Sequence, residues 1–366
     1  MKLRYIFVLL LFLLMFACNE NNTGIFYGLK YEEKIKDNSL PNNVTVGSMA
    51  KVVTNNRLYI AAGNIYTKTS RTEEEWVTVA PPSGYDLSVN LVTSDGTDLY
   101  AIYYTKKSAK KGLFSLDVNT NIWSPINISS LAGTIEDIKT ANNEIFVSTR
   151  IDPNNANIYH YTGGTPSFDL INFPDKITGS AFNVIYTGIG DYWISNYNNL
   201  YKGSISSSFT RVLSLGIREE FKGLENLNDI HICYTYWNKR ELRGYIGVTD
   251  GAGYNYDHGV GSFMLNGFKY FTITDVQNKP YLFLICATAG RGYYQVLEPT
   301  RNSIDLQRPR NNILSENYNS AIDLQDAVIL DFFIDGGDDG DLYALTATRG
   351  LWKNSDMGGY RNWSIE

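Results

Sequence analysis

Short aromatic-rich apolar segments alternate with polar turns along this chain. Segments such as Leu58-Tyr-Ile-Ala61 and Leu99-Tyr-Ala-Ile102 are too short for helices and rich in residues that favour strands. The segments recur seven times, opening at Leu58, Leu99, Ile145, Tyr192, Tyr245, Leu282 and Leu342, at intervals of 41, 46, 47, 53, 37 and 60 residues. Turns rich in Asn, Asp and Gly separate them, as in Ser94-Asp-Gly-Thr-Asp98.

A repeat of about 40 to 50 residues is typical of the four-stranded blades of a β-propeller. In six units the aromatic of the third predicted strand is followed, 8 to 11 residues later, by another aromatic: Tyr66 and Trp76, Phe114 and Trp123, Tyr159 and Phe168, Tyr201 and Phe209, Tyr254 and Phe263, and Trp352 and Trp363. Rings at equivalent positions can fill the space between blades. The pattern predicts an all-β fold, a seven-bladed β-propeller of four-stranded antiparallel blades.

Two stretches fit the repeat poorly. Residues 24–35 form a predicted isolated hairpin, which we expect to pair with the last blade because an open ring would expose strand edges. Residues 301–326 form a long polar connection between the sixth and seventh units. We assign residues 24–366 to the propeller.

The N-terminus has the pattern of a secretory leader. Lys2 and Arg4 precede residues 5–17, a run of 13 uncharged and nearly all apolar residues. This length is typical of a signal-peptide core, and it is shorter than the about 20 residues that a membrane-spanning helix needs. Residues 1–17 are therefore a predicted signal peptide.

The end of the leader, Leu14-Met-Phe-Ala-Cys18, resembles the lipobox of bacterial lipoproteins, although Met15 and Phe16 are larger than the usual residues there. The resemblance implies that the leader is cut before Cys18 and that Cys18 carries the acyl chains of a membrane anchor. Residues 18–23 would then be a lipidated tether, and the protein a lipoprotein of the cell envelope. The alternative is an ordinary signal peptide in which Cys18 has no role.

Charge argues against a nucleic-acid partner. The formal net charge is −6, and no basic stripe follows the strands. Lys106, Lys107, Lys110 and Lys111 form the densest basic cluster, which fits a solvated loop.

The sequence predicts neither a metal nor a cofactor. His160, His231 and His258 are dispersed, and no zinc-type spacing of His and Cys occurs. Asp335, Asp338, Asp339 and Asp341 lie in a glycine-rich turn that lacks the alternation of an EF-hand loop. We predict a solvated turn there, with a calcium site as the alternative.

Cys233 and Cys286 lie inside apolar strand patterns. We predict buried free thiols at both positions. A disulfide between them is the alternative in an oxidising compartment.

Three arginines carry the predicted binding site. Arg150, Arg291 and Arg349 each follow the end of a predicted second strand, and equivalent positions in a propeller open onto one face. Because guanidinium groups bind carboxylates in bidentate fashion, these residues are a candidate anion-binding rim. The alternative is that they are surface arginines beside turns.

The last unit resembles the Asp-box of sialidase-like propellers, Ser-x-Asp-x-Gly-x-x-Trp. Asn354 stands at the Ser position, Asp356 and Gly358 match, and Trp363 arrives two residues late. In that family the box is a structural turn, so the resemblance implies a fold rather than a reaction. The family's arginine cluster binds a carboxylate, but its Phe/Tyr-Arg-Ile-Pro signature is missing from this sequence.

Two hypotheses for function follow. The favoured one is a lipid-anchored, non-catalytic module that binds a protein or glycan partner, because no catalytic motif stands out and propeller faces present many loops. The alternative is a glycan-active hydrolase or lyase of sialidase-like type. Paired carboxylates beside arginines in a deep central pocket would favour the enzyme.

Overall fold

The structure is a computed structural model that describes residues 40, 44–70, 75–105, 111–163, 167–188, 190–228, 230–274, 280–297, 299–300, 304, 306, 324, 326–336, 340–354 and 363–366. All of these belong to one compact unit, Leu40–Glu366. The predicted signal peptide, Cys18 with its tether, and the predicted 24–35 hairpin lie outside the described residues, as does most of the 301–326 connection.

The described residues form seven antiparallel sheets, numbered here in chain order. Sheet 1 contains β1 (Ser48–Val52), β2 (Arg57–Ala62), β3 (Asn64–Thr69) and β4 (Val77–Val79); sheet 2 contains β5 (Leu87–Ser94), β6 (Leu99–Tyr104), β7 (Lys111–Asp117) and β8 (Ile122–Pro125). Sheet 3 contains β9 (Thr134–Ala141), β10 (Glu144–Asp152), β11 (Asn155–Thr162) and β12 (Ser167–Leu170); sheet 4 contains β13 (Asn183–Tyr186), β14 (Tyr192–Ser195), β15 (Asn199–Gly203) and β16 (Thr210–Ser214). Sheet 5 contains β17 (Glu219–Asn226), β18 (Ile232–Asn238), β19 (Arg243–Thr249) and β20 (Asn255–Gly261); sheet 6 contains β21 (Leu265–Thr274), β22 (Pro280–Thr288) and β23 (Tyr293–Leu297). Sheet 7 contains β24 (Ile329–Asp335), β25 (Asp341–Thr346), β26 (Leu351–Asn354) and β27 (Trp363–Ile365).

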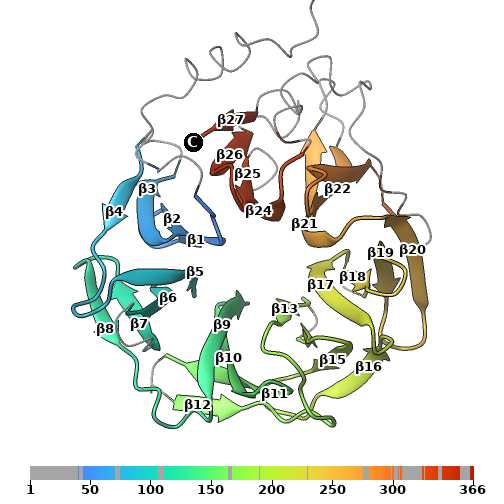
Figure 1. The fold of residues 1–366 in the computed structure, drawn as a ribbon, viewed down its shortest axis with the longest axis horizontal. Helices are drawn as coiled ribbons and strands as arrows, with labels where there is room; N and C mark the ends of the chain where they lie inside the picture. The colour runs from blue at the N-terminus through green and yellow to red at the C-terminus, as the bar shows by residue number, and fades with distance from the viewer. Residues whose placement is uncertain are drawn as a thin grey trace, which may run out of the picture. The chain divides into compact units, whose positions relative to one another are not determined.

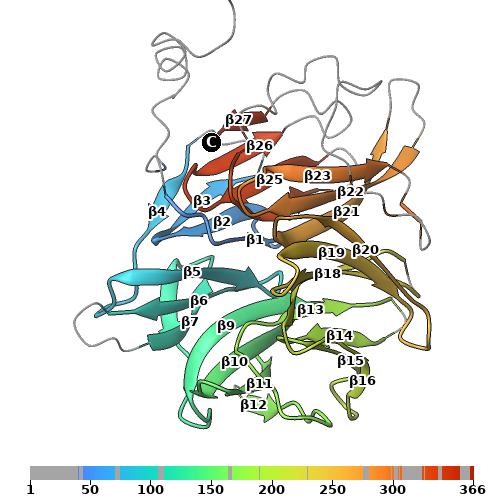
Figure 2. The ribbon, with the colours of Figure 1, turned by 45° about the vertical axis from the view of Figure 1, so that its right-hand side comes forward.

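The seven sheets form a ring, with the first strand of each sheet innermost (Figure 1). Neighbouring innermost strands contact one another around the whole ring, and β24 contacts β1. Figure 2 shows the strands of each sheet lying side by side. The predicted seven-bladed β-propeller is therefore confirmed, with sheet 6 showing three strands within the described residues. No described segment forms a helix long and apolar enough to span a membrane.

The core lies between the sheets. Each of seven buried apolar clusters fills the gap between two adjacent sheets. Tyr66 and Trp76 belong to the cluster between sheets 7 and 1, and Tyr201 and Phe209 to the one between sheets 3 and 4. The predicted packing of rings between blades is confirmed for these pairs, because large rings bridge the space that diverging sheets leave open.

The predicted strand assignments of the fifth unit are wrong. Tyr254 was expected in the third strand but lies between β19 and β20, and Phe263 lies between β20 and β21. Tyr245 was expected to open the second strand of the fifth unit, but it lies in β19, the third strand of sheet 5. The second strand is β18, which begins at Ile232. Tyr245-Ile-Gly-Val has the same apolar-aromatic composition as the second strands, so composition alone could not separate them. Counted from Ile232, the uneven intervals of 53 and 37 residues become 40 and 50.

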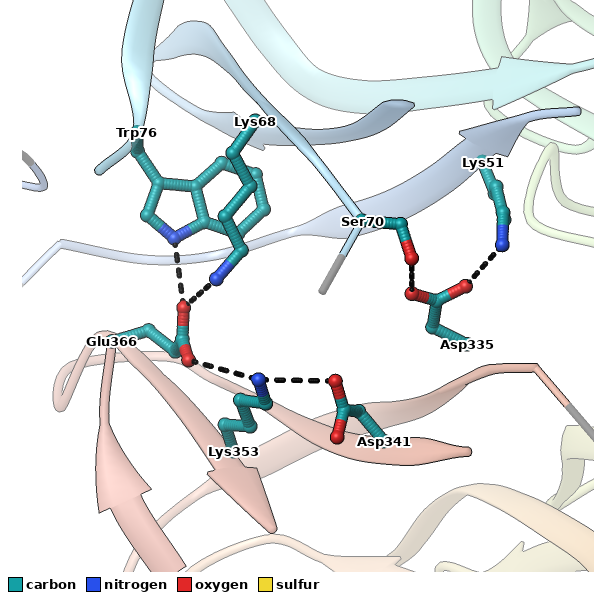
Figure 3. A network of polar contacts seen from close by, with 8 residues as sticks. All are labelled: Lys51, Lys68, Ser70, Trp76, Asp335, Asp341, Lys353 and Glu366. Carbon is teal, nitrogen blue, oxygen red and sulfur yellow. Dashed lines mark hydrogen bonds and ion pairs between the residues drawn. The ribbon is translucent and has the colours of Figure 1, made fainter. Parts of the chain in front are cut away.

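Among the described residues, side chains and a backbone hydrogen bond join sheets 1 and 7. All four strands of sheet 7 come from residues 329–365, and all four strands of sheet 1 from residues 48–79. The Val46 amide donates to the Thr346 carbonyl at 2.9 Å across the joint. Figure 3 shows a polar network there, formed by Lys51, Lys68, Ser70, Trp76, Asp335, Asp341, Lys353 and Glu366.

Candidate functional site

One face of the ring gathers the turns that follow the second strands. We name the strands of a sheet A to D from the axis outward, and we call this side the B–C face. The chain entering an A strand lies here too, because it hydrogen-bonds to the end of the preceding sheet's B strand. Ser148 Oγ donates to the Ser180 carbonyl at 2.5 Å, and the Gly292 amide donates to the Ala327 carbonyl at 3.1 Å.

Arg150 lies at the B–C face near the end of β10, with its side chain 54% exposed. Its guanidinium is 3.5 Å from the Glu136 carboxylate and donates to Ser180 Oγ at 3.4 Å. Glu136 also pairs with Lys111 of sheet 2, at 3.1 Å. Arg150 is therefore part of a polar bridge between sheets 2 and 3.

Arg291 and Arg349 occupy matching turns of sheets 6 and 7, and both are exposed. Their amides donate to Thr288 Oγ1 at 3.1 Å and to Thr346 Oγ1 at 2.9 Å. Both threonines are fully buried, and each donates its hydroxyl to the carbonyl of the glycine four residues later. The same hydroxyl-held turn thus presents an arginine on two neighbouring sheets.

The three arginines lie on the same face of the ring, but they are not all close together. Sheets 6 and 7 are neighbours, whereas sheet 3 lies across the ring from both (Figure 1). Arg291 and Arg349 therefore form the adjacent pair, and Arg150 stands apart beside Glu136. Anion binding by these residues stays a prediction.

Lysines and carboxylates pair along the innermost strands. The N–O distances are 2.6 Å for Lys51 and Asp335, 4.0 Å for Lys139 and Asp137, 2.7 Å for Lys222 and Glu220, and 3.2 Å for Lys269 and Glu225. Two of these pairs, Lys51 with Asp335 and Lys269 with Glu225, connect neighbouring sheets. The charges of these pairs on the innermost strands are thus compensated within the protein.

Four of these groups have clearly shifted pKa values, namely Asp137, Glu220, Glu225 and Lys269. Burial raises the pKa of Asp137, against the opposing effect of Lys139. The Glu225 carboxylate raises the pKa of Lys269, so this lysine stays charged. Burial also raises the pKa of Glu225, although Lys269 opposes this shift, so Asp137 and Glu225 are both innermost-strand carboxyls with raised pKa values.

A polar cluster connects the sheet 4 and sheet 5 parts of the B–C face. Lys239 donates to Tyr197 Oη at 2.8 Å, lies 4.7 Å from the centre of that ring, and is 3.0 Å from Glu220. Burial acts to raise the pKa of Glu220, but hydrogen bonds from Lys222 and Lys239 outweigh it and hold the pKa below its ordinary value. This cluster fixes the β18–β19 turn against sheet 4.

Beside this cluster lies a cavity of about 640 Å³, lined by Gly216, Ile217, Arg218, Glu219, Asn238, Arg240 and Glu241. A smaller cavity of about 330 Å³ lies over sheet 3, between β11 and residues 171–177. Neither cavity was predicted from the sequence. The consecutive charges of Lys239-Arg240-Glu241 were the available signal for the first cavity.

The predicted acidic turn is partly described. Asp335 is fully buried and contacts Lys51 and Ser70, and Asp341 lies 3.0 Å from Lys353. Each of these two carboxylates therefore forms an ion pair with a lysine. Asp338 and Asp339 lie outside the described residues. In the described part of the chain, no three His, Cys, Asp or Glu side chains are grouped to hold a metal ion.

Cys233 and Cys286 are both buried and free, in the apolar cluster between sheets 5 and 6. The predicted buried thiols are confirmed. The Asp-box-like residues Asp356 and Gly358 lie outside the described residues.

Comparison with known proteins supports the fold. The sequence matches no protein-family model and no curated protein sequence. Among solved structures, the chain is similar to a virginiamycin B lyase from Staphylococcus aureus with quinupristin, at a TM-score of 0.56 and 13% identity over 86% of this chain and 96% of the lyase. It is also similar to a GH74 xyloglucanase from Xanthomonas campestris, at a TM-score of 0.60 and 10% identity over 88% of this chain and 53% of the xyloglucanase, about half of that chain. At these identities the likeness shows a shared β-propeller fold alone.

Proposed function

We propose that the protein is a lipid-anchored binding module of the bacterial cell envelope, which engages a protein or glycan partner through its B–C face without catalysis. The observation that carries this proposal is the pairing of lysines with carboxylates along the innermost strands. A glycosidase needs two carboxylates placed to act on substrate. Here Asp335, Asp137, Glu220 and Glu225 of the innermost strands instead contact lysines of the ring.

The B–C face offers what a binding module requires. Its turns are held by buried hydroxyl groups, as at Thr288 and Thr346, so the arginines after them start from fixed backbone positions. Ordered loops on a rigid scaffold lose little entropy on binding. We include Arg291 and Arg349 as a pair, with Arg150 across the ring, as the predicted contacts to an acidic group of the partner.

Anchoring depends on the leader and on Cys18. Acyl chains on one cysteine contribute about 0.8 kcal/mol per buried CH₂, and more than one chain is needed for lasting attachment. Incorporation of labelled palmitate into the full chain, and its loss in Cys18→Ser, tests this part. An unlabelled full chain would overturn the anchor.

Partner binding is tested with glycan and protein arrays, using the chain from Asn19 onward. We expect a hit whose affinity falls at least tenfold, about 1.4 kcal/mol, in the Arg291→Ala/Arg349→Ala double variant, with an unchanged melting temperature. Arg211→Ala is the matched control, because Arg211 is also exposed but pairs with Asp175 at 3.0 Å. Equal affinity in the double variant would overturn the role of these arginines.

A glycan-active hydrolase or lyase is the second candidate. One observation favours it, since burial raises the pKa of Asp137, as a general acid requires. Every glycan that binds should therefore be assayed for turnover. Product that forms with the parent chain and is lost in Asp137→Asn would replace the non-catalytic proposal with this one.

A further inference from the structure

Two turns of sheet 5 form a distinct basic surface on the B–C face. One is the loop from Leu215 to Arg218, between β16 and β17, and the other is the turn from Lys239 to Leu242, between β18 and β19. The Lys239 amide donates to the Arg218 carbonyl at 2.8 Å, which ties the two turns together. Between them lies the cavity of about 640 Å³, within the size range of small-ligand sites.

Arg218 and Arg240 line this cavity and are exposed. Within the described residues, neither guanidinium has a hydrogen-bond or ion-pair partner. The cavity's carboxylates are already used by neutral donors. Glu219 accepts from the Gly216 amide at 2.6 Å and from Asn238 Nδ2 at 2.9 Å, and Glu241 accepts from the Tyr245 hydroxyl. The two guanidinium groups are therefore available to an anion.

The surrounding charge is basic in an acidic protein. Residues 216–222 and 238–243 carry five cationic side chains against three carboxylates, whereas the whole chain has a net charge of −6. Such a local excess attracts anionic partners over a distance of about one Debye length, roughly 10 Å.

Aliphatic side chains protrude from the same two turns. Ile217 is 91% exposed and Leu242 is 62% exposed. Leu242 also has a φ of 51°, in the left-handed region that leucine rarely adopts. A strained backbone that presents an apolar side chain to solvent points to a function for that side chain.

From these contacts we infer that this surface docks on an anionic lipid bilayer. Arg218 and Arg240 bind a phosphate headgroup in the cavity, and Ile217 and Leu242 enter the interfacial layer of the bilayer. Protruding apolar side chains ringed by cations are the pattern of membrane-surface binding, and charge complementarity selects anionic lipids. The cell-envelope location comes from the proposed function, on which this inference rests.

The chain before β1 also lies on the B–C face. Thr45 Oγ1 donates to the Ala347 carbonyl at 2.5 Å, and the Val46 amide donates to Thr346. The chain that leads from the predicted anchor at Cys18 therefore enters the propeller at the B–C face.

The test measures vesicle binding without the anchor. The chain from Asn19 onward lacks the leader and Cys18 but contains the whole compact unit Leu40–Glu366. We expect it to co-sediment with phosphatidylglycerol–phosphatidylcholine vesicles and not with pure phosphatidylcholine vesicles. Arg218→Gln/Arg240→Gln should lower the partition coefficient by about thirtyfold, from about 1 kcal/mol for each arginine near the surface. Ile217→Ser/Leu242→Gly should lower it while the melting temperature does not fall.

A matched variant separates this surface from exposed positive charge in general. Arg211→Gln removes an exposed arginine that is paired with Asp175, and it should leave vesicle binding unchanged. Equal binding of the parent and of Arg218→Gln/Arg240→Gln would overturn the inference, and so would an equal loss in Arg211→Gln. If the protein binds inorganic phosphate but no vesicles, the cavity takes a soluble anion, and this result would also overturn the inference. Partner arrays without a hit would count against the proposed function alone, because the vesicle measurement uses neither a partner nor an acyl chain.

Discussion

Lys68 of β3 forms an ion pair with Glu366, the residue that follows β27, across the joint between sheets 1 and 7. The Lys68 side chain is 3% exposed, and the Trp76 indole donates to the same carboxylate at 3.2 Å (Figure 3). Burial lowers the pKa of Lys68, and the attraction of Glu366 opposes this shift. The carboxylate therefore compensates a cation that has almost no access to water.

Removing that carboxylate should destabilise the ring. Glu366→Gln leaves the Lys68 ammonium buried without its counter-ion, and we expect the free energy of unfolding to fall by about 3 kcal/mol. Urea denaturation measures the change. Lys68→Met is the matched variant, because it removes the buried charge and keeps an apolar side chain of similar length. A loss in Lys68→Met as large as that in Glu366→Gln would contradict the role of the unpaired charge.

The Glu220 cluster predicts a pH dependence. The folded pKa of Glu220 lies below its ordinary value of 4.5, because hydrogen bonds from Lys222 and Lys239 outweigh the opposing effect of burial. The ionised carboxylate therefore stabilises the fold above pH 4.5, and this contribution disappears as the pH falls through the lower folded value. Glu220→Gln should lose about 1–2 kcal/mol at neutral pH and progressively less under acid. A loss that stays constant with pH would exclude this linkage.

Relieving the backbone at Leu242 should stabilise the protein. Glycine adopts a φ of 51° without a Cβ clash, and the exposed leucine side chain loses little packing. We expect Leu242→Gly to raise the free energy of unfolding by roughly 0.5–1 kcal/mol, measured by thermal and urea unfolding. Leu242→Ala keeps the Cβ and should give no such gain. Stabilisation by both variants would show that backbone strain is not the cause.

The two buried thiols should be unreactive in the folded protein. Burial raises the pKa of Cys233 and of Cys286, and only the thiolate is nucleophilic. In the chain from Asn19 onward, iodoacetamide at pH near 8 should modify neither cysteine until guanidinium unfolds the protein. Rapid modification under native conditions would show that the apolar cluster between sheets 5 and 6 opens. A denatured protein without free thiols would support the disulfide alternative.

The sequence predicted the strands well where one segment of each unit repeated with little change. Leu99, Ile145 and Leu342 all lie in the second strands of their sheets, because the gaps between sheets impose the same apolar pattern each time. Tyr245 was misassigned because strands B and C of sheet 5 both lie in the middle of the sheet and are both largely buried. The two strands therefore have the same apolar and aromatic composition.

The candidate site was predictable only in part. The positions of Arg291 and Arg349 after second strands follow from the repeat, so their shared face could be derived. The cavity beside Arg218 and Arg240 could not, because it depends on the backbone shape of two turns 20 residues apart in the sequence. The left-handed conformation of Leu242 could not be predicted either, because leucine rarely adopts a positive φ.

The joint between sheets 1 and 7 is the place where the first and last sheets of the ring meet. Among the described residues, each of the two sheets draws its strands from its own stretch of chain, and side-chain contacts and a backbone hydrogen bond hold the two sheets together. Thermal fluctuations should part the ring there before any blade unravels, and amide protons of β1 and β24 should exchange with solvent deuterium earlier than those of β9 and β13. The structure therefore predicts that the ring opens first between sheets 1 and 7.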